Sequence, residues 1–353
     1  MSQTPGTVTT QDDLAVVREV LAEYGEMTRA ALEPYLPKWE PRRHLYDLIA
    51  DYPRRGGKMM RPTLCLATAR AFGARPEEAL RSAVAIELLH NALLVHDDIE
   101  DGSEQRRGRP TMHEMFGVPI AINVGDTLGL LSLRPLMDNL WSVGMRLAWR
   151  IMEETERMAR ESAEGQALEL GWREQNVTDL TEADYLSMVL KKTCWLATIH
   201  PLRVGALIGS RGGVDVDRFI RFGFFLGAVF QIRDDLLNLT GDETAYGKEV
   251  GGDILEGKRT LMLIRLLRVA APAERARVEA LLGLPRIERH VEEVAWVRER
   301  MDHHGCLDYA RGIAHGLAGA AAHELDLAFE GVPASRDRRF IQSLVTWSLE
   351  RAA

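Results

Sequence analysis

Residues 87–110, ELLHNALLVHDDIEDGSEQRRGRP, place a dense cluster of charge at the end of an apolar segment. The cluster contains four carboxylates within five positions: Asp97, Asp98, Glu100 and Asp101. On a helix, Asp97 and Asp101 lie one turn apart on the same face, where like charges destabilise the helix by about 0.2–0.5 kcal/mol. Gly102 is a typical helix end, so the carboxylates also lie at the C-terminus of the helix dipole, which disfavours anions. Because a bound cation would remove both penalties, this stretch predicts a cation site.

A second stretch repeats the arrangement. Residues 222–242, FGFFLGAVFQIRDDLLNLTGD, predict another apolar helix that ends in Asp234 and Asp235, with Asn238 one turn further on. A calcium loop of the EF-hand type is excluded for the first stretch because Ile99 interrupts the alternating oxygen ligands. Mg²⁺ suits two such helix ends, since it takes one or two carboxylates, retains waters and draws its remaining ligands from substrate phosphates. A solvated helix end would explain one acidic cluster, but two clusters favour a shared metal site across a cavity.

Lysines and arginines that could bind such phosphates occur in four short segments. They are Lys58 and Arg61 in RRGGKMMRP (54–62), Arg106 and Arg107, Lys191 and Lys192 before Thr193, and Lys248 and Lys258 around Asp253. The Gly-Gly turn before Lys58 lets the backbone approach a ligand closely. The GGK sequence is not a nucleotide phosphate loop, because it lacks the GxxxxGK[ST] spacing. Each segment alone is typical of solvated surface, but together with two metal sites they predict more than one diphosphate group in one cavity.

The rest of the sequence predicts helix after helix. Apolar residues recur at three-and-four spacing in five long segments: 13–32, 76–98, 149–170, 182–209 and 216–239. Several segments are apolar on more than one face, which is typical of helices buried inside a bundle. No strand-like alternation, long linker or internal repeat divides the 353 residues. We therefore predict an all-α fold, a single-domain bundle of roughly ten or more helices around a central apolar cavity. This domain should span residues 11–353, after a flexible N-terminal tail at 1–10.

The composition narrows the class of protein. A net charge of −8 argues against a nucleic-acid-binding protein, which would need a basic face. No segment approaches the roughly 20 apolar residues of a membrane span, and the polar N-terminus does not resemble a signal peptide. The three cysteines, Cys65, Cys194 and Cys306, are isolated and odd in number, so we expect a reducing, cytoplasmic location.

The ordered motifs closely resemble those of the trans-isoprenyl diphosphate synthases, also called polyprenyl synthetases. The matches are GGKxxRP at 56–62, ExLHxxxLxHDDxxDxxxxRRGxP at 87–110, KT at 192–193, QxxDDxxN at 231–238 and YGKxxGxDxxEGKxT at 246–260. Together they cover residues 40–265 approximately, and several are long and specific. The resemblance implies a homodimeric, magnesium-dependent prenyltransferase that condenses isopentenyl diphosphate with an allylic diphosphate. Within the family, the sequence is most similar to geranylgeranyl diphosphate synthases.

The resemblance also assigns roles to the matched positions. Asp97 and Asp101, supported by Asp98, would hold the Mg²⁺ ions that bind the allylic diphosphate, and Asp234, with Asp235 nearby, would hold a third Mg²⁺. Isopentenyl diphosphate would be bound by Lys58, Arg61, His90 and Arg107. The allylic diphosphate would be contacted by Arg106, Lys192, Thr193, Gln231, Lys248 and Lys258. The catalytic set would comprise the five aspartates with Lys192 and Lys258, whereas His96 and His113 would be structural.

The chemistry of these residues agrees with that reaction. Head-to-tail coupling requires an allylic C–O bond to ionise into a carbocation and diphosphate. Fixed cations and metal ions stabilise the departing diphosphate, and apolar helix faces exclude water from the carbocation. The isopentenyl double bond then attacks and a proton leaves, which the released diphosphate is expected to accept by the family resemblance.

Product length should depend on the helix before Asp97, along which the growing tail would run. One helical turn rises about 5.4 Å, close to the length of one isoprene unit. Short-chain relatives carry a bulky aromatic residue at the positions that match Ala92 and Leu93. Because Ala92 is small, we expect a deeper floor, at Leu89 or on a facing helix, and a C20 product, geranylgeranyl diphosphate. Farnesyl and longer polyprenyl diphosphates are the alternatives, and in the simplest structural interpretation Ala92 only packs helix against helix.

Other classes of protein fit the sequence less well. A class I terpene cyclase shares the first motif, and Asp234, Asn238 and Asp242 have the spacing of its second motif. The glycine before Asp242 should end the helix first, however, and a cyclase needs no isopentenyl site. An HD-type phosphohydrolase would use the His96-Asp97 doublet but leaves the second acidic motif unexplained. A non-catalytic partner subunit typically loses one acidic motif, and here only Asn238 departs from the pattern.

Overall fold

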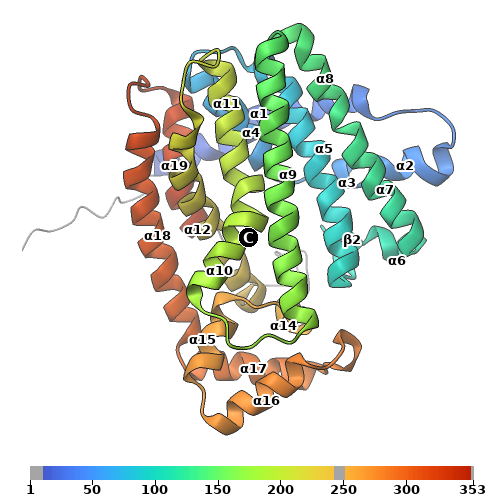
Figure 1. Ribbon diagram of the computed structural model, residues 1–353, viewed down its shortest axis with the longest axis vertical. Helices are drawn as coiled ribbons and strands as arrows, with labels where there is room; N and C mark the ends of the chain where they lie inside the picture. The colour runs from blue at the N-terminus through green and yellow to red at the C-terminus, as the bar shows by residue number, and fades with distance from the viewer. Residues whose placement is uncertain (1–10, 242–250, 351–353) are drawn as a thin grey trace, which may run out of the picture.

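Helix α5 (Pro76–Asp101) carries the first acidic motif and is enclosed by other helices along most of its length (Figure 1). It begins with Pro76 in its first turn, where the missing N–H costs no hydrogen bond. It ends at Gly102, whose φ of 62° is the left-handed conformation typical of the residue after a helix. Its neighbours are α1 (Gln11–Leu32), α4 (Met60–Ala71), α7 (Val118–Leu131) and α8 (Leu133–Ser142). The acidic motif is therefore the last turn of a buried helix, as predicted.

Helix α12 (Phe219–Thr240) carries the second acidic motif and is the other central helix. It packs against α18 (Cys306–Ala328), α19 (Arg336–Glu350) and the segment η3 (Leu190–Ile199). Segment η3 consists of wide, π-type turns and lies between α10 (Glu182–Val189) and α11 (His200–Gly209). The predicted helix 182–209 is therefore three consecutive segments, and its π-type part carries the KT motif. Such turns are frequent at functional sites.

Two glycines explain how η3 fits between its neighbours. A Cβ atom on Gly165 of α9 (Met145–Glu174) would lie 2.2 Å from the backbone nitrogen of Lys192. A Cβ atom on Gly227 of α12 would lie 2.8 Å from Cys194 Sγ. Both distances are too short for a side chain, so the glycines allow α9 and α12 to clamp η3 from two sides.

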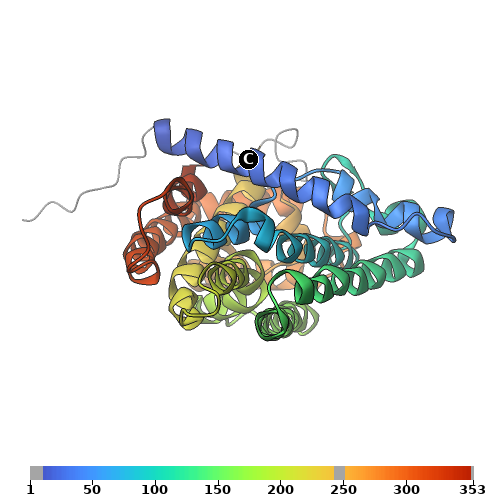
Figure 2. The ribbon, with the colours of Figure 1, turned by 90° about the horizontal axis from the view of Figure 1, so that it is seen from above.

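The structure, a computed structural model, describes residues 11–241 and 251–350, and shorter elements complete it. They are η1 (Glu33–Tyr35), η2 (Arg42–Tyr46), α2 (Asp47–Ile49), α3 (Asp51–Arg54), α6 (Met112–Phe116), η4 (Val216–Arg218), α14 (Gly252–Glu256), α15 (Leu261–Val269), α16 (Pro272–Leu282), η5 (Arg286–Glu288) and α17 (Val291–His303). In Figure 2, α1 lies across one face of the bundle, where it contacts α4, α5 and α19. Helices α16 and α17 close the lower end in Figure 1.

One hairpin is the only sheet in the described part of the chain, and it was not predicted from the sequence. It pairs β1 (Gln105–Arg106) with β2 (Arg109–Pro110), antiparallel. Its two turn residues, Arg107 and Gly108, have φ of 56° and 71°, the positive values of a type I′ hairpin turn. The hairpin is too short to change the fold class but presents the RRG motif beside α5.

The predicted all-α bundle is confirmed, and the buried apolar side chains of the described residues form three clusters. The predicted helices 13–32, 76–98, 149–170 and 216–239 correspond to α1, α5, α9 and α12, with η4 at the start of α12. Buried side chains of α1, α4, α11, α12, α18 and α19 form one large apolar cluster. Within it, Phe72 and Phe219 both contact Phe329, with ring centroids 5.7 and 5.5 Å away. None of the described helices is long and apolar enough to cross a membrane.

Candidate active site

A cavity of about 490 Å³ lies where the C-terminal halves of α5 and α12 face α9 and η3. Its charged wall consists of Arg61, His90, Asp97, Glu100, Lys192, Asp234, Asp235, Asp253 and Lys258. Its apolar wall consists of Leu93, Leu94, Ala163, Ala167, Leu170 and Leu196. The remaining lining side chains are His96, Ser162, Gln166, Thr193 and Gln231. Both acidic motifs therefore meet in one cavity that is lined by charged and by apolar side chains.

The first acidic motif presents Asp97 to the cavity beside two cations. Lys192 Nζ lies 3.3 Å from Asp97 Oδ1, and Arg106 Nη2 lies 3.7 Å from Asp97 Oδ2. Asp101, one turn on, accepts a hydrogen bond of 2.5 Å from Arg173 Nη1 of α9. Burial and the charge of Asp97 raise the pKa of Asp101 to about 6. The like-charge repulsion expected from the spacing is thus present, and cationic side chains compensate it.

Asp98 points away from the cavity and is fully buried. Tyr52 Oη donates a hydrogen bond of 2.6 Å to Asp98 Oδ2, and Arg106 Nε donates one of 2.9 Å to Asp98 Oδ1. Arg106 Nη2 also donates to Asp98 Oδ1. The predicted supporting role of Asp98 is consistent with this placement. Arg106 is committed to Asp98 and only its Nη2 reaches toward Asp97.

In the second acidic motif, too, one of the two adjacent aspartates is more buried than the other. Asp234 and Asp235 both line the cavity, but Asp235 is almost fully buried. Asp235 accepts hydrogen bonds from Tyr185 Oη at 2.8 Å and from Gln231 Nε2 at 2.7 Å. Burial raises the pKa of Asp235, even though Lys258 Nζ, 3.9 Å away, acts in the opposite direction. Thr193 completes the chain of contacts by donating to Gln231 Oε1 at 2.8 Å.

The two cavity lysines are fixed by carboxylates, one of which the sequence analysis missed. Lys192 Nζ donates a hydrogen bond of 2.6 Å to Glu169 Oε1 of α9, and Glu169 is 1% exposed. Although burial alone would raise the pKa of Glu169, the charges of Lys192 and Lys258 lower it. Lys258 Nζ lies 3.7 Å from Asp253 Oδ1. Asp253 and Asp235 raise the pKa of Lys258 well above its usual value against the effect of burial, so the lysine stays charged.

Helix α9 offered a signal for Glu169 that the sequence analysis did not use. Gly165, Glu169 and Arg173 are spaced by four residues, so they form one stripe along the helix. Gly165 permits the close approach of η3, Glu169 binds Lys192 and Arg173 binds Asp101. This stripe does not line the 490 Å³ cavity itself but holds η3, Lys192 and Asp101 beside it.

The residues predicted to bind isopentenyl diphosphate lie in two different places. Arg61 Nη1 lies 3.2 Å from His90 Nε2 in the cavity wall. Burial lowers the pKa of Arg61 to about 10, and burial with the charge of Arg61 lowers the pKa of His90 well below its usual value. Among the described residues, Arg61 Nε and His90 Nδ1 are buried without a hydrogen-bond partner. Arg61 therefore remains charged beside a neutral His90, with donor capacity left for a ligand.

The other two, Lys58 and Arg107, lie at the glycine turn 56–57: Lys58 follows it in sequence, and Arg107 contacts it from the hairpin turn. Arg107 Nη1 donates to the carbonyl oxygens of Tyr52, at 3.3 Å, and of Gly56. A Cβ atom on Gly57 would lie 2.8 Å from Arg107 Nη2, so the second glycine makes room for the guanidinium. Lys58 Nζ lies 5.6 Å from the ring centre of Trp347. Neither residue lines the 490 Å³ cavity.

Asn238 and Lys248 complete the predicted set. Asn238 Oδ1 accepts a hydrogen bond of 3.1 Å from the backbone N–H of Asp253, which positions that carboxylate beside Lys258. An aspartate would also accept this bond, so asparagine is a conservative departure from the motif. Lys248 and Asp242 lie outside the described residues.

The predicted chain-length residues face three different surroundings. Leu93 lines the cavity, whereas Leu89 lines a small apolar hollow behind it, together with Ile86 of α5 and Met158 of α9. Ala92 differs from the expectation, because it belongs to the apolar cluster of α5 and α7 instead of the cavity wall. The reason is that α5 is apolar on several faces, and α7 covers the face of Ala92.

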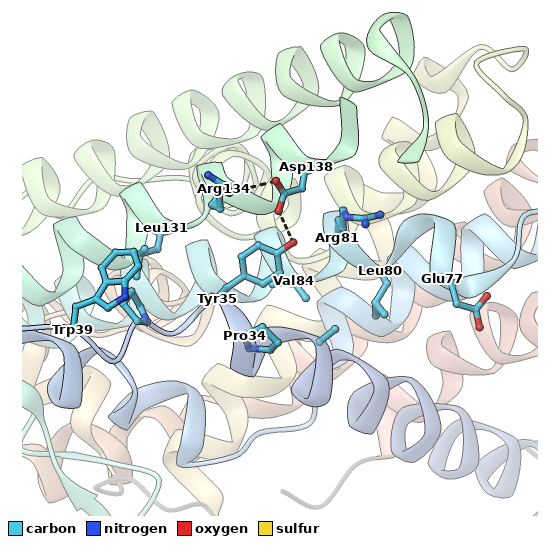
Figure 3. A pocket seen from close by; sticks show the side chains of 12 residues that line it. Pro34, Tyr35, Trp39, Glu77, Leu80, Arg81, Val84, Leu131, Arg134 and Asp138 are labelled. Atoms are coloured by element: carbon cyan, nitrogen blue, oxygen red, sulfur yellow. Dashed lines mark hydrogen bonds and ion pairs between the residues drawn. The ribbon is translucent and has the colours of Figure 1, made fainter. Parts of the chain in front are cut away.

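A larger hollow of about 930 Å³ lies elsewhere, between η1, α5 and α8 (Figure 3). Tyr35 Oη donates a hydrogen bond of 2.9 Å to Asp138 Oδ2, and Arg134 Nε lies 3.3 Å from Asp138 Oδ1. Tyr35 and Asp138 point toward each other across the hollow, as Figure 3 shows. It contains no residue of either acidic motif, so size alone does not identify the active site.

Comparison with known proteins gives a consistent picture. The family model described as polyprenyl synthetase matches residues 42–301. A geranylgeranyl pyrophosphate synthase from Geoglobus acetivorans is 32% identical over 336 residues, 95% of this chain and 99% of that protein. A geranylfarnesyl diphosphate synthase from Aeropyrum pernix is 35% identical over 263 residues, 73% of this chain and 80% of that protein.

A solved structure adds the fold to this comparison. The polyprenyl synthase from Caulobacter crescentus, complexed with calcium and isoprenyl diphosphate, superposes with a TM-score of 0.82. It is 27% identical, and the match covers 99% of this chain and 100% of that one. The family is metal-dependent. With the two acidic helix ends, the KT segment and the fold all in agreement, the chain belongs to the polyprenyl synthetase family and is a trans-prenyltransferase.

Proposed function

We propose that this chain condenses isopentenyl diphosphate head to tail with an allylic diphosphate and makes geranylgeranyl diphosphate, C20. One observation carries the proposal: two acidic helix ends, the cations Arg61, Lys192 and Lys258, and a set of apolar side chains line the same cavity. An allylic diphosphate has the same two parts, a polyanionic head and an apolar tail. The relatives named geranylgeranyl and geranylfarnesyl diphosphate synthase support this substrate class.

The metal in this proposal is Mg²⁺, three ions per active site. Asp97 and Asp101 would hold two of the ions and Asp234 the third. Within residues 11–241 and 251–350, no three His, Cys, Asp or Glu side chains form a ready-made metal cage. The donor set nevertheless fits Mg²⁺, which needs one or two protein carboxylates and takes other ligands from water and phosphate. Bound Mg²⁺ would supply charge that stabilises the leaving diphosphate.

The protein's own residues would act on both substrates. Lys192 and Lys258, each held by a buried carboxylate, would bind oxygens of the departing diphosphate in fixed positions, which lowers the reorganisation cost of ionisation. Arg61 and neutral His90 would orient isopentenyl diphosphate, using the unpartnered buried donors Arg61 Nε and His90 Nδ1. Leu93 and its apolar neighbours would exclude water from the carbocation. The released diphosphate would take up the proton.

The C20 product is supported by the position of the apolar wall. Leu93 lies one turn before Asp97 and Leu89 one turn before that, and one turn rises about 5.4 Å. The hollow lined by Leu89 and Met158 continues the direction of the tail. We propose that Leu93 leaves room for the tail and that Leu89, with Met158 on the facing helix, forms the floor. A longer C25 product would require this pair to move apart.

A homodimer is the proposed assembly, and one surface fits it. Apolar side chains are exposed along α7, α8 and the start of α9: Val118, Ile120, Ile122, Leu130, Leu133, Met137, Leu140, Trp141, Met145 and Trp149. Exposed apolar patches of this extent typically mark protein contacts. Trp141→Glu should yield monomers in size-exclusion chromatography with light scattering, whereas Ile287→Glu, at an exposed apolar residue elsewhere, should not. A monomeric wild type would refute the dimer.

We also propose a cytoplasmic location. The support is that Cys65, Cys194 and Cys306 are all free thiols and buried, which is typical of proteins that fold under reducing conditions. Localisation of a tagged full-length chain by cell fractionation tests this point.

Mass spectrometry of reaction products tests the proposed activity. The enzyme should convert isopentenyl diphosphate with C5, C10 and C15 allylic diphosphates to C20 in the presence of Mg²⁺. Release of a cyclised hydrocarbon from the allylic substrate alone would indicate a terpene cyclase and contradict the proposal.

A further inference from the structure

Two buried tyrosines hold the more buried aspartate of each acidic pair. Tyr52, in α3, donates to Asp98 at 2.6 Å, and Tyr185, in α10, donates to Asp235 at 2.8 Å. Both tyrosines are 1% exposed, so these hydrogen bonds are shielded from water. Each tyrosine comes from a short helix outside the helix that carries the motif. A hydrogen bond from a buried tyrosine to an aspartate therefore occurs at both acidic motifs.

Each tyrosine–aspartate pair also anchors a cation that reaches toward the cavity. Arg106 Nε lies 2.9 Å from Asp98 Oδ1, and its Nη2 extends to within 3.7 Å of Asp97. Lys258 Nζ, in the cavity wall, lies 3.9 Å from Asp235. Hydrogen bonds to ionised acceptors are the strong ones. Removing one donor would leave the carboxylate free to turn and would displace its cation.

Tyr52 has additional contacts that connect the two proposed diphosphate sites. Its hydroxyl accepts the Met112 N–H at 3.1 Å, and its carbonyl oxygen accepts from Arg107 at 3.3 Å. Arg55 lies over its ring at 4.5 Å and donates to the carbonyl oxygen of Arg106 at 3.1 Å. The glycine turn, the hairpin, α6 and the end of α5 thus meet at one side chain.

We propose that Tyr52 and Tyr185 are positioning residues of the prenyl transfer site. By fixing Asp98 and Asp235, they hold the last turns of α5 and α12 so that Asp97 and Asp234 face the metal–diphosphate complex. The inference rests on the proposed function, since it assigns a purpose to the orientation of Asp97 and Asp234. Outer contacts of this kind typically change metal affinity by about 10–100-fold when they are removed.

The test compares Tyr52→Phe and Tyr185→Phe with a matched control. Tyr24→Phe is that control, because Tyr24 is also 1% exposed and donates to a carboxylate, Asp337, at 2.6 Å, away from the cavity. The first measurement is the Mg²⁺ concentration that gives half-maximal turnover at saturating substrates. The second is the Mg²⁺ concentration that gives half of the thermal stabilisation produced in the presence of inorganic pyrophosphate, which needs no turnover.

Both Mg²⁺ midpoints should rise about tenfold or more in Tyr52→Phe and Tyr185→Phe. Both Mg²⁺ midpoints should stay at the wild-type value in Tyr24→Phe, even if the melting temperature of this variant falls as much as those of the two site variants. Wild-type midpoints in the two site variants, or an equal shift in the control, would overturn the inference. If the wild type forms no prenyl product, the proposed function fails, while the pyrophosphate measurement still decides the role of the tyrosines.

Discussion

The carboxyl group of Asp101 gives a quantitative prediction for the metal-free protein. Its pKa is raised from 3.8 to about 6 by burial and by Asp97, and at 6% exposure solvent screens it little. A carboxyl that binds its proton more tightly when folded stabilises the fold below pH 4, and this contribution is lost as the pH rises through 6. A shift of about two units corresponds to roughly 3 kcal/mol in total. Roughly 1 kcal/mol of it should be lost between pH 5 and pH 7.

Asp101→Asn isolates this contribution, because asparagine does not titrate. The free energy of unfolding is measured by urea titration with circular dichroism, in chelator, at pH 5 and pH 7. The wild-type value minus the variant value should be larger at pH 5 by roughly 1 kcal/mol. Asp184→Asn is the control: capping hydrogen bonds lower the pKa of Asp184, so its carboxylate is ionised throughout this range and its difference should stay constant. A constant difference for Asp101→Asn as well would show that the pKa of Asp101 is not raised in the folded protein.

Five further substitutions probe the site in separate ways. Lys58→Ala should mainly raise the KM for isopentenyl diphosphate, and Lys258→Ala should mainly raise the KM for the allylic substrate. Each change corresponds to a loss of roughly 1.5–3 kcal/mol of binding free energy. Steady-state kinetics in which each substrate is varied in turn measures both values. Equal effects on both substrates would contradict the assignment. Glu169→Gln should lower kcat by displacing Lys192, and an unchanged kcat would count against that contact. Leu93→Phe should shift the product, measured by mass spectrometry, from C20 toward C15. Ala92→Phe should leave the product unchanged but destabilise the fold by roughly 1–3 kcal/mol, because the larger side chain would collide with α7. The opposite pattern would place the isoprenoid tail along Ala92.

Much of the fold could be predicted because its signals are local. The three-and-four spacing of α1, α5, α9 and α12 follows from helix geometry, and Gly102 ends α5 through its own backbone preference. The acidic motifs could be located for the same reason, since charge at an apolar helix end is visible in one stretch. The π-type turns of η3 could not be predicted in this way, because η3 packs closely against glycines of α9 and α12 that are distant in sequence.

The orientation of individual side chains required the tertiary structure. Asp97 and Asp98 are adjacent in sequence, but only the contacts of Asp98 with Tyr52 and Arg106 show which of them is turned away from the cavity. Ala92 illustrates the same difficulty on a helix that is apolar on several faces, where no polar stripe distinguishes cavity from core. Glu169 was missed because α9 carries many charges, and the contact with Lys192 is what shows that Glu169 belongs to the site.

The central claim is that the two acidic helix ends form one metal–diphosphate site. Equilibrium dialysis with Mn²⁺ in the presence of inorganic pyrophosphate tests it most directly, because it counts bound ions without turnover. Three ions should bind per wild-type active site, one in Asp97→Ala and two in Asp234→Ala. An unchanged count in both variants, with the helical fold intact by circular dichroism, would contradict it.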